Sequence, residues 1–200
     1  MDPDPPWLAW TPDEVAEHLQ GIATRWYVVA GWALDLYRGA QSREHEDIEI
    51  GVPAAGFSEL RRALADYECE VVGSIEDEDA RRWPLDSAAF DEHFQTWFKD
   101  PTTGVYRLDV FRDPHDADVW VCRRDASIRV PYDDAIRTTP TGIPYLVPEL
   151  VLLFKAKHAR DKDQADLAGV LPLLDASQVD RLRTGLEIVH PGHPWLSQLG

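Results

Sequence analysis

Two acidic side chains, Asp47 and Glu49, stand two positions apart in the sequence REHEDIEIGV of residues 43–52. Apolar residues occupy the positions between and after them, an alternation that predicts a strand over residues 47–52 with one acidic and one apolar face. Two carboxylates held on one face repel each other unless a cation lies between them. Carboxylate oxygens are ligands that suit Mg²⁺. The pair therefore predicts a magnesium site, whereas the alternative is a strand face that is simply exposed to solvent.

A glycine precedes this acidic pair and begins a helical pattern. Residues 30–39 read AGWALDLYRG, which predicts a helix over residues 31–37 that ends near Gly39. A helix N-terminus with a glycine turn offers backbone N–H groups to a phosphate, the group that a magnesium ion would also hold. A basic loop, residues 42–45, joins this helix to the acidic strand. The glycine turn, the basic loop and the acidic strand together favour the metal site over the solvent-exposed face. They predict metal-assisted phosphoryl transfer.

A third acid lies within the predicted strand YRLDVF. Asp109 has apolar neighbours on both sides, and a lone buried carboxylate is costly unless it has a partner. We therefore expect Asp109 to join Asp47 and Glu49 as a metal ligand. Its second role would be that of a general base that takes a proton from an acceptor hydroxyl. Asp113 and Asp116 follow in a turn that contains a proline, and we expect both to be exposed to solvent.

Two blocks of the sequence resemble known nucleotidyltransferases. Residues 26–52 are similar to the core of the polymerase-β-like nucleotidyltransferase superfamily. Within them, the sequence AGWALDL followed by REHEDIEI is similar to the aminoglycoside and lincosamide nucleotidyltransferases. The second block reads GIPYL, PEL, FKAKH and KDQAD within residues 142–166. Together the two blocks extend the resemblance over about residues 26–174, which is most of the chain. The resemblance implies the nucleotidyltransferase fold and an enzyme of that class.

The chain departs from this family pattern at two positions. Ala30 stands where the family usually places the first glycine of the turn, so a backbone contact to phosphate is expected to be altered or lost. Glu49 stands where aspartate is commoner, which lengthens the side chain by a methylene group but keeps the same kind of ligand. The first departure favours a non-catalytic member of the fold, and the second leaves the metal site intact.

The resemblance also implies which residues bind the nucleotide. Gly31 and Trp32 would belong to the turn at the phosphates. The loop with Arg43 and His45 would face the triphosphate, where an arginine supplies a fork of two donors. The alternatives are a surface salt bridge between Arg43 and a neighbouring glutamate, and a structural hydrogen bond from His45 that fixes the loop. The implied cofactors are two Mg²⁺ ions and ATP or another NTP.

Lys155, Lys157 and Lys162 form the main basic cluster of an acidic chain. One of the first two is expected to reach the β- and γ-phosphates, with Lys155 favoured. The alternative is that they are ordinary lysines at a helix end, where the helix dipole favours positive charge. Asp163 and Asp166 are expected to orient these lysines by ion pairing.

The composition fits one main domain. The chain has 200 residues, of which 44% are apolar and eight are Trp. We expect a nucleotidyltransferase core over residues 1–146 and a C-terminal helical segment over residues 147–200, unless the two form one continuous domain. The start of the chain lacks the features of a signal peptide, and no apolar run is long enough to span a membrane. Cys69 and Cys122 are expected to be buried or idle thiols in a reducing compartment, so we predict a cytoplasmic protein with no membrane partner.

Twenty basic and 36 acidic residues give a formal net charge of −16. This charge repels nucleic acid, whose binding depends on basic residues that neutralise phosphates. It would attract a cationic small molecule, and the acidic run of residues 76–79 would contribute to that attraction. The alternative is an acidic surface kept for solubility. The predicted partners are an NTP and a small-molecule acceptor, and the sequence does not determine the oligomeric state.

The order of predicted elements indicates an α+β fold. Strands are expected at residues 26–29, 47–52, 68–73, 96–99, 106–111, 119–122 and 128–130. Helices are expected at residues 12–19, 31–37, 57–67, 148–158, 161–171 and 177–189. These elements predict a nucleotidyltransferase-type mixed sheet of about five or six strands flanked by helices, followed by a C-terminal helical segment.

The leading hypothesis is a magnesium-dependent nucleotidyltransferase that moves a nucleoside monophosphate to a hydroxyl of a small, cationic acceptor. We expect AMP from ATP as the transferred group, and the resemblance suggests an aminoglycoside or lincosamide as acceptor. One alternative is a non-catalytic or regulatory member of the fold that binds a nucleotide or a partner protein. Another is a toxin-type nucleotidyltransferase that acts on protein or tRNA, of which tRNA fits the negative charge less well.

Overall fold

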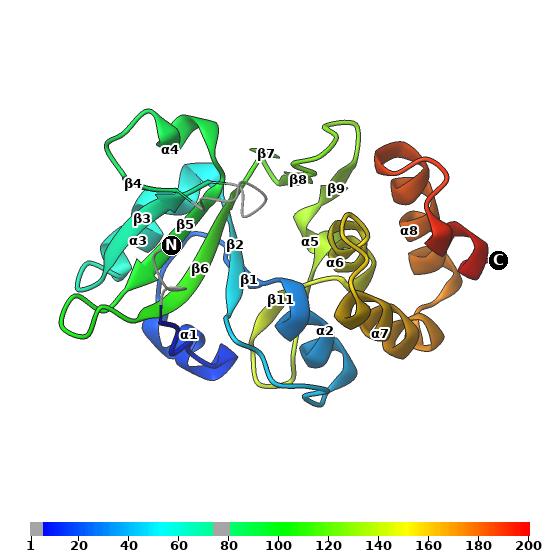
Figure 1. Cartoon of the computed structure of the whole chain (residues 1–200), viewed down its shortest axis with the longest axis horizontal. Helices are drawn as coiled ribbons and strands as arrows, with labels where there is room; N and C mark the ends of the chain where they lie inside the picture. The colour runs from blue at the N-terminus through cyan, green and yellow to red at the C-terminus, as the bar shows by residue number, and fades with distance from the viewer. Residues whose placement is uncertain (1–5, 74–80) are drawn as a thin grey trace. The chain divides into compact units, whose positions relative to one another are not determined.

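The computed structural model describes residues 6–73 and 81–200 of the chain (Figure 1). The chain forms two compact units, one made of residues 1–28 and 44–114, the other of residues 29–43 and 115–200. The acidic run of residues 76–79 lies outside the described residues. Because the two units interleave along the sequence, they do not correspond to a single cut after residue 146. The division into a core and a C-terminal segment stays a prediction.

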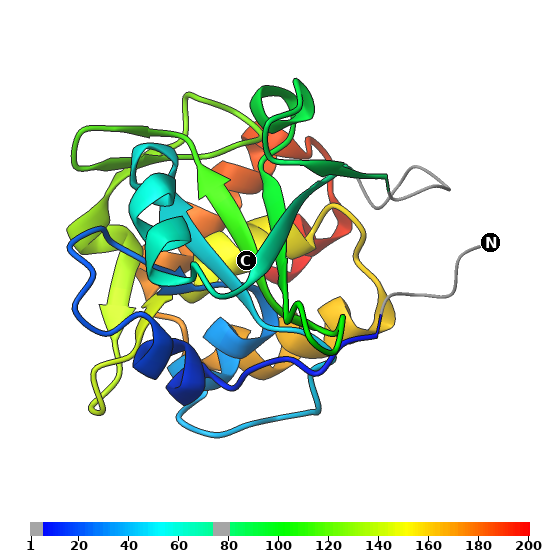
Figure 2. The same cartoon turned by 90° about the vertical axis from the view of Figure 1, so that its left-hand side faces the viewer.

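The first unit is built on a mixed sheet, of which the described residues contribute six strands in the order β1-β2-β6-β5-β3-β4. Strands β2 and β6 are parallel, and the other neighbours are antiparallel. The strands are β1 (Tyr27–Val28), β2 (Glu49–Pro53), β3 (Glu68–Val72), β4 (Arg82–Pro84), β5 (Gln95–Lys99) and β6 (Tyr106–Asp113). The helices are α1 (Pro12–His18), η1 (Ala54–Gly56), α3 (Phe57–Ala63) and α4 (Ala89–Glu92). Figure 2 shows the strands of this sheet from a second direction.

Helix α1 begins where the sequence predicts. The side chain of Thr11 accepts a hydrogen bond from the backbone N–H of Glu14 at 3.3 Å, and the side chain of Glu14 accepts one from the N–H of Thr11 at 2.7 Å. This reciprocal pair satisfies two donors that the first helical turn would leave without partners. Pro12 suits the first position because it has no N–H group to satisfy. The helix ends at His18, one residue earlier than predicted.

Strand β2 has the predicted apolar face but begins later than predicted. Ile48, Ile50 and Val52 are fully buried, which confirms the alternation read from the sequence. Pairing with β6 begins at Glu49, so Asp47 lies just before the strand instead of within it. The sequence pattern identified the buried face correctly, and the hydrogen-bonded partner strand determined where the strand begins.

The second unit is mainly helical. Its helices are α2 (Ala30–Arg38), α5 (Tyr132–Ala135), α6 (Pro148–Lys155), α7 (Asp161–Val170), η2 (Leu171–Leu173), α8 (Ala176–Val189) and η3 (Pro194–Gln198). Strands β7 (His115–Asp116), β8 (Val119–Val121) and β9 (Arg129–Pro131) form a small antiparallel sheet, and β10 (Ile136–Thr138) pairs with β11 (Pro144–Leu146). The C-terminal helices confirm the predicted helical segment. The pair β10 and β11 was not predicted, because each strand has only three residues.

Helix α6 is shorter than the predicted helix over residues 148–158. It ends at Lys155, and Ala159 has a φ of 45°, in the left-handed region that does not continue a right-handed helix. Helices α7 and α8 agree with the prediction to within one residue at each end.

The two units together confirm the α+β class with a mixed sheet, flanking helices and C-terminal helices. Among the helices in residues 6–73 and 81–200, none combines the length and apolar character that a membrane crossing requires.

Candidate active site

The parallel pairing of β2 and β6 brings two of the three predicted acids together. Glu49 lies directly opposite Asp109 in the register, and the backbone N–H of Asp109 donates to the carbonyl oxygen of Ile48 at 3.0 Å. Residues opposite each other on neighbouring strands project to the same face of a sheet. The third acid therefore comes from a neighbouring strand, as predicted. Asp109 is only 2% exposed, whereas Glu49 and Asp47 are partly exposed.

The two oxygens of Asp109 have different environments. Oδ2 accepts a hydrogen bond from the side-chain amide of Gln95 at 2.5 Å. Oδ1 is buried and makes no hydrogen bond with any described residue. Burial raises the pKa of Asp109 well above its usual range, and the negative charges of Glu49 and then Asp47 raise it further, while the amide of Gln95 acts against them. The carboxylate is therefore poised to take up a proton or a cation.

This acidic face fits a hard divalent cation by its chemistry. Oδ1 of Asp109 lacks a hydrogen-bond partner among the described residues, and the negative charges of Glu49 and Asp47 act to raise the pKa of Asp109. In the described part of the chain, no three His, Cys, Asp or Glu side chains converge into a group that could hold a metal as they stand. The predicted roles of Asp47, Glu49 and Asp109 as metal ligands stay predictions.

Strand β6 continues beyond Asp109 and buries a residue that we expected to be exposed. Asp113 is 3% exposed and accepts a hydrogen bond from the hydroxyl of Tyr27 at 2.6 Å. The prediction for Asp113 was wrong because β6 extends through it, and the proline turn begins only afterwards. Asp116 is exposed as predicted, and it forms an ion pair with Arg129 at 2.5 Å.

In the second unit, helix α2 begins with the predicted turn. Ala30 is its first residue and has a φ of 53°, in the left-handed region that glycine adopts most easily. Gly31 is buried and Trp32 partly buried in the first turn, and the N-cap residue Val29 makes no capping hydrogen bond with its side chain among the described residues. Ala30 thus keeps the backbone conformation that a glycine would have at this position. The first turn has the arrangement in which backbone N–H groups bind anions.

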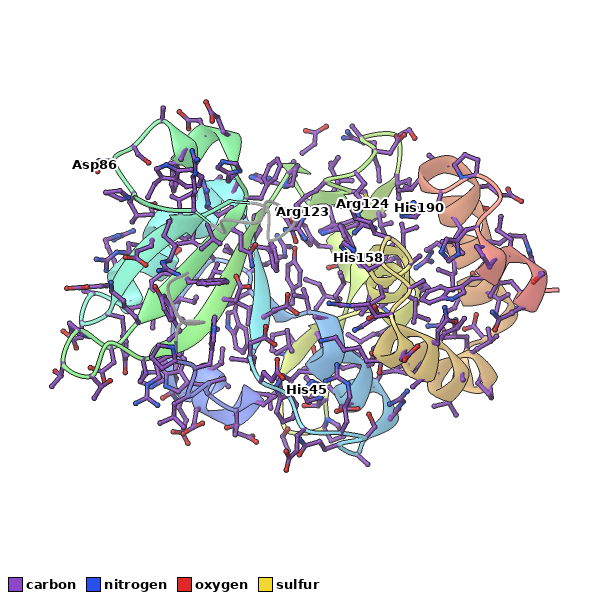
Figure 3. All side chains as sticks on the ribbon, viewed as in Figure 1. His45, Asp86, Arg123, Arg124, His158 and His190 are labelled. Carbon is purple, nitrogen blue, oxygen red and sulfur yellow. The ribbon has the colours of Figure 1, made fainter. Side chains whose placement is uncertain are left out.

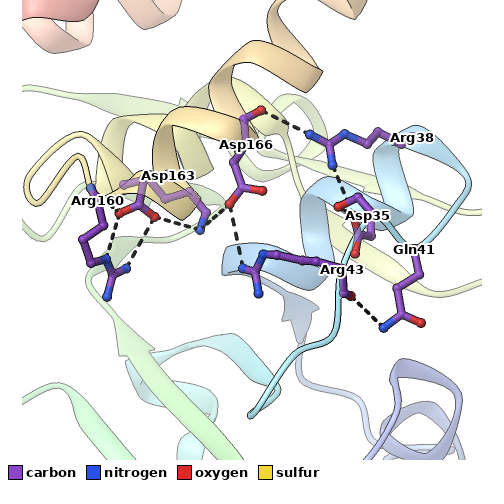
Figure 4. Close-up of polar contacts among 9 residues, drawn as sticks. Asp35, Arg38, Gln41, Arg43, Arg160, Asp163 and Asp166 are labelled. Carbon is purple, nitrogen blue, oxygen red and sulfur yellow. Dashed lines mark hydrogen bonds and ion pairs between the residues drawn. The ribbon is translucent and has the colours of Figure 1, made fainter.

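The loop that follows α2 belongs to a network of ion pairs in the second unit (Figure 4). Arg43 lies 3.8 Å from Oδ2 of Asp166, and Lys155 lies 2.9 Å from the same oxygen. Lys155 also donates to Oδ1 of Asp163 at 3.3 Å, and Arg160 donates to Oδ2 of Asp163 at 2.9 Å. The prediction that Asp163 and Asp166 pair with a lysine is confirmed for Lys155.

Three residues of this network are buried. Lys155 is 9% exposed, and Asp163 and Asp166 are buried. Burial acts to raise the pKa of Asp163, but the hydrogen bond from Arg160 and the charges of Lys155 and Arg160 outweigh it and leave that pKa below its usual range. Lys155 is therefore held between α6 and α7 with its charge matched by carboxylates. A contact between Lys155 and phosphate stays a prediction.

Other predicted residues occupy more open positions. Lys157 is exposed just after α6, and His45, labelled in Figure 3, is partly buried in the loop before β2.

The sequence pattern did not single out Gln95 and Asp35. Asp35 is buried in α2, where it accepts a hydrogen bond from Ser42 at 2.6 Å and pairs with Arg38 at 3.4 Å. Its helical spacing from Arg38 was a signal in the sequence, whereas Gln95 had none until the strand register was known.

A family model decides what kind of protein has this arrangement. The model of the family described as aminoglycoside-2″-adenylyltransferase matches residues 13–127, more than half of the chain. The chain belongs to this family. It is therefore an enzyme of the nucleotidyltransferase class, as the sequence predicted. The matched residues include β2, β5 and β6 with Glu49, Gln95 and Asp109, and they end before Lys155.

Solved structures resemble the chain at low sequence identity. A lincosamide antibiotic adenylyltransferase crystallised with lincomycin is 18% identical, with a TM-score of 0.54, over 81% of this chain and 95% of that one. The aminoglycoside enzyme ANT(2″)-Ia, solved with adenylyl-2″-tobramycin, is 12% identical over 94% of this chain and 91% of that one, with a TM-score of 0.47. A nucleotidyltransferase-like protein from Paracoccidioides brasiliensis is 17% identical over 93% and 88%, with a TM-score of 0.46. The first of these supports the nucleotidyltransferase fold, and no curated protein sequence matches the chain.

Proposed function

We propose that this enzyme transfers a nucleoside monophosphate from an NTP to a hydroxyl group of a small, cationic antibiotic, with Mg²⁺ as cofactor. ATP is the expected donor, and an aminoglycoside or lincosamide is the expected acceptor. The observation that carries the proposal is the pairing of Glu49 with a buried Asp109 whose Oδ1 has no hydrogen-bond partner among the described residues. The family match supports the type of transfer.

The residues of the acidic face have distinct proposed roles. Asp47 and Glu49 are partly exposed, and together with the buried Asp109 they would hold a cation. When bound, Mg²⁺ supplies positive charge that offsets the negative charge of the triphosphate. Asp109 would accept the proton of the acceptor hydroxyl as that oxygen bonds to the α-phosphorus and the bond to the departing pyrophosphate breaks.

The proposed contacts to phosphate come from the turn that begins α2 and from the loop that follows this helix. The uncapped first turn of α2, with Gly31 and Trp32, would bind phosphate oxygens through backbone N–H groups. Arg43 and His45, from the loop before β2, would add side-chain donors. The left-handed conformation of Ala30 supports this assignment, because the turn keeps its shape despite the missing glycine. The same observation weakens the alternative of a non-catalytic member of the fold.

The phosphate contact from the basic cluster is proposed for Lys155 or Lys157. The ion pairs of Lys155 with Asp163 and Asp166 would hold its ammonium group in a fixed position for such a contact. Lys157 is exposed, so its ammonium group would reach a phosphate from the surface. Replacing each lysine by methionine distinguishes the two. The variant that raises KM for the NTP, measured at a temperature where both variants are fully folded, identifies the lysine that contacts phosphate.

The proposed acceptor class follows from the family match and from charge. The net charge of −16 would attract a cationic aminoglycoside and disfavour tRNA, the substrate of the toxin-type alternative. If the charge steers the acceptor, its kcat/KM should fall as salt rises from ~10 to ~150 mM and the Debye length shrinks from about 30 to about 8 Å. A kcat/KM that is independent of salt would leave solubility as the purpose of the acidic surface.

The test of the proposal is direct transfer. Purified protein with Mg²⁺ is incubated with labelled ATP, CTP, GTP or UTP and a panel of hydroxylated aminoglycosides and lincosamides, and pyrophosphate release and labelled antibiotic are measured. The proposal expects transfer with ATP that requires Mg²⁺ and is lost in Asp109→Asn. Absence of transfer to every antibiotic, or full activity of Asp109→Asn, would refute it. Labelling of a protein or tRNA instead would establish the toxin-type alternative.

A further inference from the structure

Strand β5 places two hydrogen-bond donors beside the acidic face. Gln95 and Trp97 stand two positions apart on β5, so both side chains project to the same face of the sheet. Trp97 lies directly opposite Asp109 in the antiparallel pairing of β5 with β6, and Gln95 lies opposite Phe111. We propose that Gln95 is a positioning residue for Asp109, assisted by Trp97. This role rests on the function proposed above. Gln95 and Trp97 are additional to the site residues predicted from the sequence, none of which lies on β5.

The hydrogen bond from Gln95 gives the two carboxylate oxygens of Asp109 different roles. Its side-chain amide donates to Oδ2 of Asp109 at 2.5 Å, whereas Oδ1 is buried and makes no hydrogen bond with a described residue. A buried carboxylate held by one oxygen cannot rotate freely about its last bond. Gln95 thereby leaves Oδ1 as the oxygen that faces a cation or an acceptor hydroxyl. It also favours the charged carboxylate, because a donor to a carboxylate stabilises the ionised form.

Trp97 is held firmly enough to support this arrangement. It is 7% exposed, and its ring packs edge-on against Trp7 and Tyr106, with centroids 5.2 Å away in each case. Its indole N–H makes no hydrogen bond among the described residues, although it acts to lower the pKa of Asp109. The ring is therefore held rigidly at the position opposite Asp109 on the neighbouring strand.

The test removes the donor without changing the fold. Gln95→Leu keeps a side chain of similar volume but cannot hydrogen-bond, and Gln95→Met is a second variant if the first folds poorly. Thr96→Val is the matched control. Thr96 is the neighbouring residue on the opposite face of β5, is fully buried, and has a hydroxyl with no hydrogen-bond partner among the described residues. Its replacement removes a polar group from the same strand without touching Asp109.

A positioning role predicts a specific change in kinetics. Gln95→Leu should lower kcat by roughly 10- to 100-fold, the usual effect of losing a group that orients a ligand, with KM for the NTP unchanged. Thr96→Val should keep the wild-type kcat. Because Asp109→Asn is expected to lose transfer, the comparison in that background uses Mn²⁺ affinity: Gln95→Leu should lower it no further, since the residue that it orients has already been altered. An equal loss in both backgrounds would show that Gln95 acts independently of Asp109 and would overturn the proposal.

A second readout does not depend on activity. Thermal unfolding is followed while Mn²⁺ is titrated without nucleotide, and the rise in melting temperature reports cation affinity. The affinity should fall about 10-fold in Gln95→Leu and stay unchanged in Thr96→Val. If the wild type transfers nucleotide but Gln95→Leu keeps its kcat and Mn²⁺ affinity, the positioning role fails and the proposed function stands. If the wild type transfers nothing but Mn²⁺ affinity depends on Gln95, the proposed function fails and the positioning role stands.

Discussion

Replacing Ala30 by glycine should make the protein more stable, although glycine usually weakens a helix. Ala30 begins α2 with a φ of 53°, where an L-residue loses roughly 1–2 kcal/mol relative to the right-handed helical conformation. Glycine avoids this strain. Glycine also makes the unfolded chain more flexible, which lowers the free energy of unfolding by about 0.4–1 kcal/mol. The expected net effect of Ala30→Gly is a gain of about 0.5–1 kcal/mol in the free energy of unfolding.

The assay is thermal and urea unfolding of matched variants. For a chain of this length, 1 kcal/mol corresponds to roughly 2–4 °C, so Ala30→Gly should raise the melting temperature by about 1–4 °C. Ala159→Gly provides an independent comparison, since Ala159 has a φ of 45°. Ala33→Gly is the opposite control. Ala33 lies inside α2 and is fully buried, and the same substitution there should cost about 1 kcal/mol or more.

The outcome that would refute the reasoning is a loss of stability in Ala30→Gly similar to that in Ala33→Gly. Such a result would mean that Ala30 is not strained, and that the first turn of α2 does not have the left-handed start described above. A gain in Ala30→Gly and Ala159→Gly together with a loss in Ala33→Gly would confirm that the sign follows the backbone conformation instead of the residue type.

Three further substitutions test other parts of the structure. Asp47→Asn should abolish transfer even with saturating Mg²⁺, while its melting temperature in metal-free buffer holds or rises because a repulsive charge is removed; full turnover would contradict the metal assignment. Lys155→Met should lower the free energy of unfolding by roughly 3 kcal/mol, since it leaves buried carboxylates without their cation, whereas Lys157→Met should change it little; equal effects in urea unfolding would refute the buried network. Burial and the adjacent Arg124 hold the pKa of His190 below its usual range, so the unfolded chain takes up the proton more readily than the folded protein. Stability should therefore fall as the pH drops below about 6.5, and His190→Asn should reduce that fall in pH-dependent melting; an unchanged pH profile would contradict this.

Much of the local structure could be predicted because its causes are local. The capping residues Thr11 and Glu14 lie within one helical turn, and Gly39 ends α2 with a φ of 75° because glycine accepts that conformation easily. The alternation around Ile48 and Ile50 predicted the buried face of β2. Each of these signals lies between residues a few positions apart, so the sequence displays it directly.

The site depends on contacts between residues far apart in the chain. The sequence by itself determined which residue types could bind a cation and phosphate, since Asp47, Glu49 and Asp109 were recognised from their neighbours. Only the tertiary structure decided that Glu49 lies opposite Asp109, and that Gln95 donates to the carboxylate. The physical reason is that strand register is set by hydrogen bonds and side-chain packing between separate segments, and a shift of one residue would turn every side chain to the other face.

The same distinction applies to the charged residues of the second unit. The sequence by itself identified Lys155 as part of a basic cluster and Asp163 and Asp166 as its partners. Only the packing of α6 against α7 decided that Lys155 is buried between both aspartates, while Lys157 remains exposed. A charged side chain looks the same in a sequence whether it is exposed or buried. Its energetic role is decided by desolvation and by its charged neighbours, and both are properties of the folded chain.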